Sequence, residues 1–413
     1  AAILHIKLHL DSTLETNLPI NFVSSNSVDF GLMGYFAAAN AAAKSNFDSL
    51  MIPFRCLAAN ISDRKETIFE SGDLATSIRA SMTYPFYISP ISIDGDIMFD
   101  GGLYNNFPAN VLCDEFQPDF IIASNVASKP ESPSEENLIS QIKSILTKES
   151  NFEINCTVGI IINSNVEDIA TFDFYAIDNA IDSGYKSTLN LIDSISNKIQ
   201  KKRSLQEVQA RRLSFHQKKP NLEFNKVDIN GLKSNHAKYI RQSLTVDSSV
   251  YQLDKITPKY YMLATNEKVK SIYPSAKYNE ETGKFELILD VKKEKSFNVS
   301  FGGVVATKPF STGFFELDYQ ILKSTGLKAS GNIYFGSFYA AEEARVRWDI
   351  PFDIPFYLES QFTVNRYDYF NGRSTFIEED DPPYIITSES YWESKLVLPI
   401  FTKGKLAFGA SYI

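Results

Sequence analysis

The chain has 413 residues, of which 44% are hydrophobic and 22% charged, so it is long enough for two or three domains with separate cores. Its formal net charge of −9 at pH 7 argues against nucleic acid as the main partner, because binding a phosphate backbone requires clustered Lys and Arg. The cysteines are odd in number and far apart, so we expect buried thiols and neither a disulfide framework nor a zinc site. They are Cys56, Cys113 and Cys156.

The N-terminal stretch carries few signals. It lacks the charged segment and apolar core of a targeting signal, so we expect none in this chain. Residues 3–10 predict a strand, and a polar loop follows up to Ile20. His5 and His9 lie four residues apart without a third ligand nearby, so we expect no metal site there. No window holds 18 consecutive apolar residues, so any membrane role requires strands.

The next elements are a helix, a strand and a second helix. Residues 29–44 predict a helix whose small alanines suit packing against a sheet, and residues 52–61 predict a buried strand. Asp73 is a good N-cap for the second helix. The apolar face of that helix comprises Leu74, Ile78 and Met82. Arg79 lies off this face, and two roles remain open for it: orienting a nearby site, or pairing with a surface acid.

Residues 89–108 predict a hairpin that delivers one aspartate to a glycine pair. Ile91 and Ile93 alternate with polar neighbours, Asp94-Gly95 is a two-residue turn signal, and residues 97–99 form a short apolar return strand. The return strand ends at Asp100, Gly101 and Gly102. We expect these glycines to take positive φ and to let the backbone approach another group closely. Pro108 suits the first turn of a helix running to Phe116.

This corner has two interpretations. In the first, the Asp100 carboxylate lies beside a reactive centre and takes part in catalysis. In the second, Asp100 only caps a turn.

Strand and helix continue to alternate, which predicts an α/β region. Residues 120–126 and 157–163 are continuous apolar runs, typical of strands buried on both faces of a sheet. Residues 128–137 are rich in Pro, Ser and Glu and predict an exposed loop. Residues 177–199 predict a closing helix. Its apolar positions are Leu189, Ile192, Ile195 and Ile199.

These segments together resemble the patatin-like phospholipases. The matching order is IPFRCLAANI (52–61), ESGDLATSIRASMTYPF (70–86), the hairpin with its Asp-Gly-Gly end, and PDFIIASNV (118–126). The resemblance covers roughly residues 30–195 and implies a serine–aspartate dyad that hydrolyses glycerophospholipid acyl esters through an acyl-enzyme, without a metal or organic cofactor. It makes Asp100 the general base. The residues that support the motif are Gly101, Gly102, Asn105, Asn106 and Pro108.

The serine half of that chemistry has no match in the sequence. Patatin-like enzymes carry the nucleophile in G-x-S-x-G, after a glycine-rich loop that binds the oxyanion. No two of the 19 glycines stand four positions apart, so neither segment is present. We therefore expect this chain to hold the aspartate but not the serine, and to be inactive by itself.

A basic stretch and a small module follow. Residues 198–219 hold eight Lys or Arg against the single acid Glu207, and we favour a solvated linker over contact with anionic lipid. Residues 221–295 then read strand, helix, helix, strand, strand, an order that resembles the POTRA modules of outer-membrane barrels. The expected elements are a strand at 224–232, a helix at 234–244 capped by Ser234, a helix at 258–272, and a hairpin at 275–294.

After Ser296 the pattern has strict period two. Leu317 and Tyr319 alternate with Asp318 and Gln320, and similar runs of about ten residues recur to the end. Such runs suit a transmembrane barrel, although a soluble β-sandwich also alternates. Short connections follow the second, fourth and sixth strands. The longest connection, 370–390 with the acidic run 378–381, follows the fifth. About seven strands are expected, and hence an incomplete barrel.

We therefore predict a multidomain chain similar to the patatin-like autotransporters. Residues 1–197 form the C-terminal part of an α/β patatin-like domain, 198–220 a basic linker, 221–295 an α+β POTRA-like module, and 296–413 the first strands of an antiparallel outer-membrane β-barrel. The expected partners are phospholipid substrate and outer-membrane lipids. The soluble domains are expected on the periplasmic side or at the cell surface, and the oligomeric state stays open. The alternatives are a secretion or assembly barrel with a degenerate patatin-like binding domain, and a soluble hydrolase with a β-sandwich.

Overall fold

The computed structural model describes residues 2–8, 21–127, 135, 141–142, 144, 147–148, 151–170, 172–199, 202–244, 250–305, 312–336, 339–352, 355–368, 386–400 and 404–413. The chain divides into two compact units, one formed by 21–24 and 35–220 and the other by 1–20, 25–34 and 221–413. The boundary near residue 220 coincides with the end of the expected linker, whereas the boundary at 295 stays a prediction. His9, most of the loop 128–137 and the acidic run 378–381 lie outside the described residues.

A four-stranded antiparallel sheet forms the part of the first unit that carries the Asp-Gly-Gly corner. Its order is β3-β2-β5-β4. Every residue of β2 is buried, as expected for a central strand, but β2 is shorter than the predicted strand at 52–61. The strands are β2 (Cys56–Asn60), β3 (Lys65–Phe69), β4 (Ile91–Ile93) and β5 (Asp96–Asp100).

The predicted hairpin is confirmed. Antiparallel β4 and β5 are joined by Asp94 and Gly95, which both have positive φ, of 54° and 94°. Two successive positive φ values match the twist of antiparallel strands, and Asp-Gly tolerates them. After the short 3₁₀ helix η2 (Gly101–Leu103), helix α3 (Ala109–Phe116) ends at Phe116 as predicted, but Pro108 is its N-cap and not a residue of its first turn.

Helix α2 (Leu74–Ser81) begins at the expected N-cap, where the Asp73 side chain accepts a hydrogen bond from the Thr76 amide at 2.7 Å. Its predicted apolar face is wrong in part, because Met82 is exposed and Ile78 only half-buried. Small side chains allow this helix to pack closely against β2 and β5. The buried residues of α2 are Leu74, Ala75, Ser77, Arg79 and Ala80.

Two further predictions for this unit need correction. Strands β6 (Phe120–Asn125) and β7 (Val158–Asn163) form a parallel pair, but Ile122 is 48% exposed and Val158 56% exposed, so neither strand is buried on both faces. The single helix expected at 177–199 is two helices, α5 (Ile177–Leu189) and α6 (Ile192–Lys198), separated at 190–191. Ile195 is buried, whereas Leu189 and Ile192 are exposed.

The basic stretch forms helix α7 (Leu205–Lys218), which starts with a reciprocal capping box between Ser204 and Glu207. None of its residues is buried, in agreement with a solvated linker.

The expectation for the cysteines is wrong. Cys113 and Cys156 form a disulfide, with their Cα atoms 6.0 Å apart. Cys56 is a free, buried thiol, and burial raises its pKa to about 12.

The second unit contains a small α+β module whose order is the predicted one except for an added two-residue strand, Tyr251–Gln252, between the helices. Its sheet runs β10-β11-β8-β9, with β11 parallel to β8 and β10 antiparallel to β11. The helix expected at 258–272 instead begins at Leu253 and ends at Ala264, so that Ile272 lies in a strand. Helix α8 begins at Ser234 itself rather than after it. The elements are β8 (Glu223–Asn230), α8 (Ser234–Leu244), β9 (Tyr251–Gln252), α9 (Leu253–Ala264), β10 (Val269–Asn279) and β11 (Lys284–Lys293).

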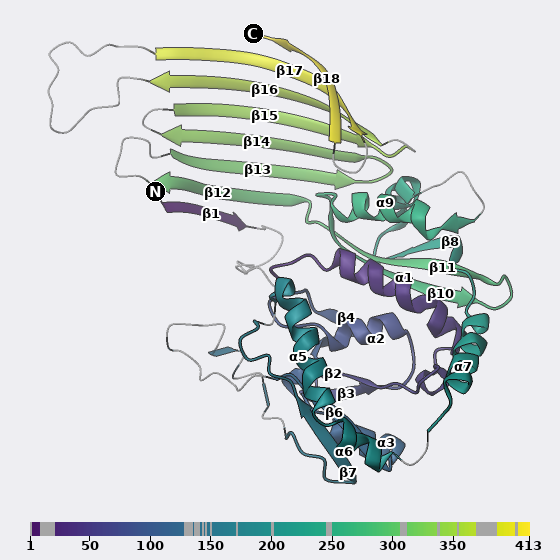
Figure 1. The fold of residues 1–413 in the computed structure, drawn as a ribbon. Coiled ribbons are helices and arrows are strands. Elements are labelled where there is room, and N and C mark those ends of the chain that lie inside the picture. Colours follow the sequence, from purple (N-terminus) through teal and green to yellow (C-terminus); the bar gives the residue numbers. More distant parts are fainter. Residues whose placement is uncertain are drawn as a thin grey trace. The chain divides into compact units, whose positions relative to one another are not determined.

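An eight-stranded antiparallel sheet completes this unit, in the order β1-β12-β13-β14-β15-β16-β17-β18 (Figure 1). Seven strands were predicted after Ser296; the eighth, β1, pairs with β12 along its length. Helix α1 (Asn26–Ala42) begins three residues earlier than expected. No helix among the described residues is long and apolar enough to cross a membrane. The strands are β1 (Ala2–Leu8), β12 (Phe297–Val305), β13 (Thr312–Leu322), β14 (Gly326–Gly336), β15 (Tyr339–Ile350), β16 (Phe356–Asp368), β17 (Ile386–Ile400) and β18 (Gly404–Tyr412).

The two faces of this sheet have opposite character, as the alternation predicts. On β16, Phe362 is 50% exposed while its neighbour Thr363 is 4% exposed. We call the buried side the polar face; it includes Asn298, Ser300, Asp318, Gln320, Asp349, Thr363 and Asn365. We call the other side the apolar face; it includes Leu317, Tyr319, Val346, Trp348, Leu358, Phe362 and Val364.

Candidate functional site

Asp100 is the last residue of β5, where the sheet gives way to η2. Its backbone is fixed on two sides: it pairs with Ala58 of β2, and its amide donates a hydrogen bond to the Thr83 carbonyl oxygen at 2.8 Å. Its side chain accepts a hydrogen bond from the Gly102 amide at Oδ1, at 2.8 Å. The carboxylate therefore has a defined position at the strand end.

The second carboxylate oxygen of Asp100 has no hydrogen-bond donor among the described residues. Burial raises the pKa of Asp100, and the Gly102 hydrogen bond offsets part of that rise. A desolvated carboxylate binds a proton more readily than one in water. One oxygen is thus held in place while the other is available to accept a proton.

The glycine pair is needed for close packing, and the expectation of positive φ is wrong for both residues. Among the glycines, positive φ occurs at Gly72, Gly95, Gly231 and Gly283 in the described parts of the chain. At Gly101, a Cβ atom would lie 2.4 Å from the Leu57 carbonyl oxygen. At Gly102, it would lie 2.7 Å from Asn106 Oδ1 and 3.1 Å from Asp100 Oδ1. Gly101 therefore lets η2 pack on β2, and Gly102 leaves room beside the carboxylate.

Of the other motif residues, Asn106 lies beside the Asp100 carboxylate, whereas Asn105 and Pro108 have structural contacts elsewhere. Asn106 lies beside Gly102 and Asp100, as the same geometry shows. Asn105 is directed elsewhere, because its amide donates to Glu66 at 2.9 Å and to Asn110 at 3.1 Å. Pro108 occupies the N-cap position of α3 without a side-chain hydrogen bond, so its contribution is to start the helix.

Arg79 is fully buried, which excludes a surface ion pair. Its guanidinium donates to Thr83 Oγ1 at 2.5 Å and to the Ser89 carbonyl oxygen at 2.7 Å. The Thr83 hydroxyl in turn donates to the Arg79 carbonyl oxygen at 2.7 Å. Arg79 thereby fixes Thr83, and the Thr83 carbonyl holds the Asp100 amide.

Thr83 was missed by sequence reasoning. It is fully buried and lies just beyond the end of α2, in the segment that leads to the hairpin. The signal in the sequence was a threonine four residues after an arginine, at the end of a predicted helix. No local pattern shows that the carbonyl group of this threonine accepts a hydrogen bond from Asp100.

In the described part of the chain, neither a metal site nor a nucleophile accompanies Asp100. The described residues contain no group of three His, Cys, Asp or Glu side chains arranged to hold a metal ion. Within the same residues, the hydrogen bond from Gly102 is the carboxylate's single hydrogen bond, so no serine hydroxyl is joined to it.

Comparison with known proteins places the corner in a patatin-like segment. Residues 23–112 match the family model described as patatin-like phospholipase. An uncharacterised NTE family protein of Mycobacterium bovis is 35% identical over 60 residues, which are 14% of this chain and 10% of that protein. A patatin-like phospholipase domain-containing protein of Caenorhabditis elegans is 36% identical over 67 residues, 16% of this chain and 5% of that one. The matched segments thus span about a tenth or less of these relatives.

Solved structures give a weaker likeness. BamA from Haemophilus ducreyi lacking POTRA domains 1–3 has a TM-score of 0.25 at 9% identity, over 46% of this chain and 48% of that one. CdiB from Acinetobacter baumannii has a TM-score of 0.31 at 12% identity, over 46% of this chain and 37% of that one. Similarity at this level assigns no fold.

Proposed function

We propose that this protein is a lipid acyl hydrolase of phospholipase A type, in which Asp100 is the general base for a serine nucleophile. The observation that carries the proposal is the environment of the Asp100 carboxylate: partly buried at a strand end, held at Oδ1 by the Gly102 amide, and without a hydrogen bond at its other oxygen among the described residues. The match of residues 23–112 to patatin-like phospholipases supports the substrate class.

A serine hydroxyl is a weak nucleophile until a base within hydrogen-bonding distance takes its proton. In this mechanism the second carboxylate oxygen of Asp100 accepts that proton while the serine oxygen attacks the ester carbonyl carbon. The proton then passes to the leaving alcohol, and the acyl group stays on the serine. Water activated by the same carboxylate releases the fatty acid. The printed sequence contains no G-x-S-x-G segment to supply the serine.

The surrounding residues give this base its properties. Desolvation raises the pKa of Asp100 toward the operating pH, which favours proton transfer by a carboxylate. Thr83 and Arg79 position the strand end, and Gly102 and Asn106 shape the space next to the carboxylate. These residues act through Asp100 and do not themselves take part in proton transfer.

We further propose that the sheet from β12 to β18 is part of an outer-membrane β-barrel and that the module 221–295 is POTRA-like. The support is the exposed apolar face opposite a buried polar face, since a soluble sandwich buries its apolar side chains instead. The disulfide Cys113–Cys156 fits an oxidising compartment. Short connections after the second, fourth and sixth strands favour the periplasmic side for the patatin-like segment and the module, because outer-membrane barrels carry short turns on that side. The connection from Gly336 of β14 to Tyr339 of β15 follows the third strand and is also short, so connection length alone does not distinguish the two sides.

A test of the membrane assignment uses the full-length protein with Val346→Arg and Val346→Leu. An arginine on a lipid-facing strand position is strongly destabilising near the bilayer centre, by about 2–4 kcal/mol. We expect the parent and Val346→Leu to fractionate with outer membranes and to migrate as a heat-modifiable band, and Val346→Arg to lose that band. Recovery of folded parent protein without detergent would instead support the soluble hydrolase.

The alternative is a secretion or assembly barrel with a degenerate patatin-like domain, favoured by the absence of G-x-S-x-G from the printed sequence. A full-length protein that inserts normally but shows no ester hydrolysis would support this alternative.

A further inference from the structure

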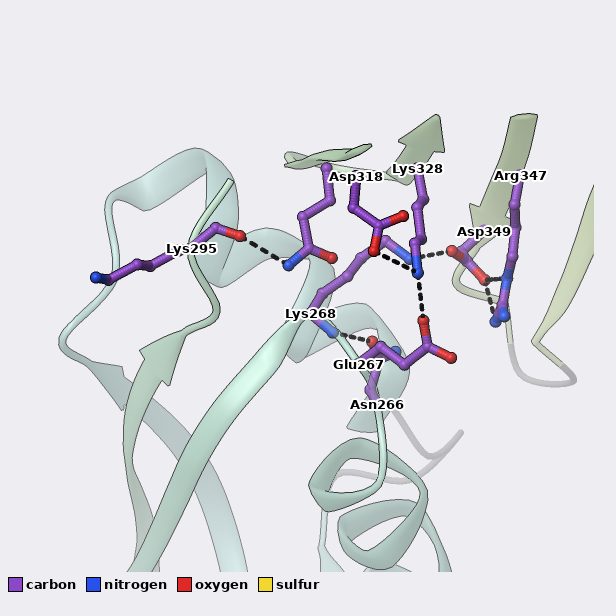
Figure 2. Close-up of polar contacts among 9 residues, drawn as sticks. Asn266, Glu267, Lys268, Lys295, Asp318, Lys328, Arg347 and Asp349 are labelled. Carbon is purple, nitrogen blue, oxygen red and sulfur yellow. Dashed lines mark hydrogen bonds and ion pairs between the residues drawn. The ribbon is translucent and has the colours of Figure 1, made fainter. Parts of the chain in front are cut away.

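A cluster of charged side chains joins the corner between α9 and β10 to the polar face of the sheet (Figure 2). From the corner, Lys268 pairs with Asp349 near the end of β15. The two side chains are 3% and 9% exposed, so this is a buried ion pair. Arg347 completes it by donating to the other oxygen of Asp349 at 2.9 Å.

A second pair lies next to the first. Lys328 of β14 contacts Glu267 of the corner at 3.2 Å and Asp318 of β13 at 3.6 Å. Asp318 Oδ1 is buried without a hydrogen-bond partner in the described part of the chain. The positive charge of Lys328 therefore offsets part of the cost of burying this carboxylate. The Glu267 side chain is largely exposed, so the Lys328–Glu267 pair contributes less to stability than the buried Lys268–Asp349 pair.

The backbone is shaped to admit this contact. Gly326 opens β14 opposite Asp349, and a Cβ atom there would lie 2.7 Å from Lys268 Cε. The Asn266 side chain accepts a hydrogen bond from the Lys268 amide at 3.0 Å and donates to the Tyr239 hydroxyl of α8 at 3.1 Å. Lys268 is therefore anchored in the module at its base and inserted over Gly326 at its tip.

The connection between the module and the sheet lies on the same side. The side chain of Gln320, in β13, donates a hydrogen bond to the Lys295 carbonyl oxygen at 2.9 Å. The backbone N–H of Gln320 donates to the Ser296 carbonyl oxygen at 2.7 Å. The chain from β11 to β12 is thus held against β13 next to the ion pairs.

We propose that Lys268 and Asp349, with Arg347, Lys328, Glu267 and Asp318, form a latch that fixes the orientation of the module 221–295 on the ends of β13 to β15. Apolar contact alone would allow several orientations, because hydrophobic burial is non-directional. A buried ion pair is specific, since separating its partners leaves uncompensated buried charges. The latch does not depend on the role of Asp100.

The test is the rate of trypsin cleavage after Lys295, in the connection from β11 to β12, in the full-length protein in detergent micelles. Slow cleavage of a closed segment follows the population of its open form. We expect Lys268→Met and Asp349→Asn each to raise the rate by about tenfold or more, and the double variant to be no faster than the faster single. Lys226→Met, which removes an exposed pair with Asp228 in the same module, should keep the parental rate.

A steric test changes no charge. Gly326→Val should expel Lys268 and raise cleavage, whereas Gly331→Val on the same strand has no atom within 4 Å of its Cβ and should not. Lys268→Arg, which keeps the charge, should remain closer to the parent than Lys268→Met. Near-ultraviolet circular dichroism identifies variants that do not fold. If Lys268→Met or Asp349→Asn does not fold, the comparison of Gly326→Val with Gly331→Val tests the latch. Parental cleavage rates in folded Lys268→Met and Gly326→Val, or additive effects in the double variant, would overturn the latch.

Discussion

The Asp100 amide donates a hydrogen bond to the Thr83 carbonyl oxygen at 2.8 Å, across 17 positions of sequence that contain the whole β4–β5 turn. Because Arg79 holds Thr83 through its hydroxyl, a fully buried guanidinium and the candidate base are joined by two successive contacts. The end of α2 and the end of β5 are thereby fixed to each other, and the orientation of the carboxylate depends on both.

We expect Thr83→Val to weaken this arrangement without changing the volume of the side chain much. It removes an acceptor from a buried guanidinium and a donor to the Arg79 carbonyl, a loss of about 1–3 kcal/mol in the free energy of unfolding. Chemical denaturation of the parent and variant measures this. Thr83→Ser, which keeps the hydroxyl, is the matched control and should recover most of the loss. Equal stability of Thr83→Val and the parent would show that the hydroxyl does not hold Arg79.

The disulfide makes a prediction that requires no substitution. Thiol titration of the denatured, unreduced protein should find one reactive thiol, Cys56, and three after reduction. The bond closes a loop with a sequence separation of 43, and its removal by Cys113→Ser should lower the free energy of unfolding by about 2–4 kcal/mol. Cys56→Ala provides the comparison for loss of a thiol alone. Three reactive thiols before reduction would contradict the pairing.

Asp100→Asn should change how stability depends on pH. Burial raises the pKa of Asp100 above its usual 3.8, so the folded state disfavours the ionised form. The stability that Asp100 contributes is then complete below pH 3.8 and is lost as pH rises through the folded-state pKa. Because asparagine cannot ionise, its contribution to the free energy of unfolding does not change with pH.

The unfolding midpoint of the parent minus that of Asp100→Asn should therefore fall as pH rises from about 3.5 to about 7. Asp94→Asn, at the exposed turn of the same hairpin, corrects for the loss of one negative charge. A difference that rises with pH would mean that hydrogen bonds to the ionised form outweigh desolvation.

Local patterns predicted the hairpin and its flanks because the signals there are local. Asp94-Gly95 specifies its turn by backbone conformation, and Asp73 and Pro108 mark helix starts by their own chemistry. The period-two alternation after Ser296 likewise determines which side chains share a face of the sheet. The candidate base could be located from sequence for the same reason.

The remaining features depend on contacts that are distant in sequence. Helix α9 accommodates Pro258 because Ile256, Tyr260 and Leu263 are almost fully buried, and this packing outweighs the one backbone hydrogen bond that proline removes. Arg79 is buried where helix periodicity predicts a surface position, since its partners come from residues 83 and 89.

Two further corrections have the same origin. The pairing of Cys113 with Cys156 depends on the packing of α3 near the segment before β7, which spacing does not encode. The apolar composition of β6 gives no information on how many of its faces are covered, and Ile122 is exposed.

The central claim is that Asp100 takes the proton of a serine, and the most direct test is phospholipase A turnover by full-length Asp100→Asn on mixed micelles. Asparagine keeps the shape of the side chain and an oxygen for the Gly102 amide but cannot accept the serine proton. We expect kcat to fall by about 100-fold or more, the usual size of a general-base contribution, while Asp94→Asn keeps parental turnover. Parental turnover in Asp100→Asn, with Asp100→Ala losing only stability, would show that Asp100 is a turn cap and would contradict the catalytic assignment.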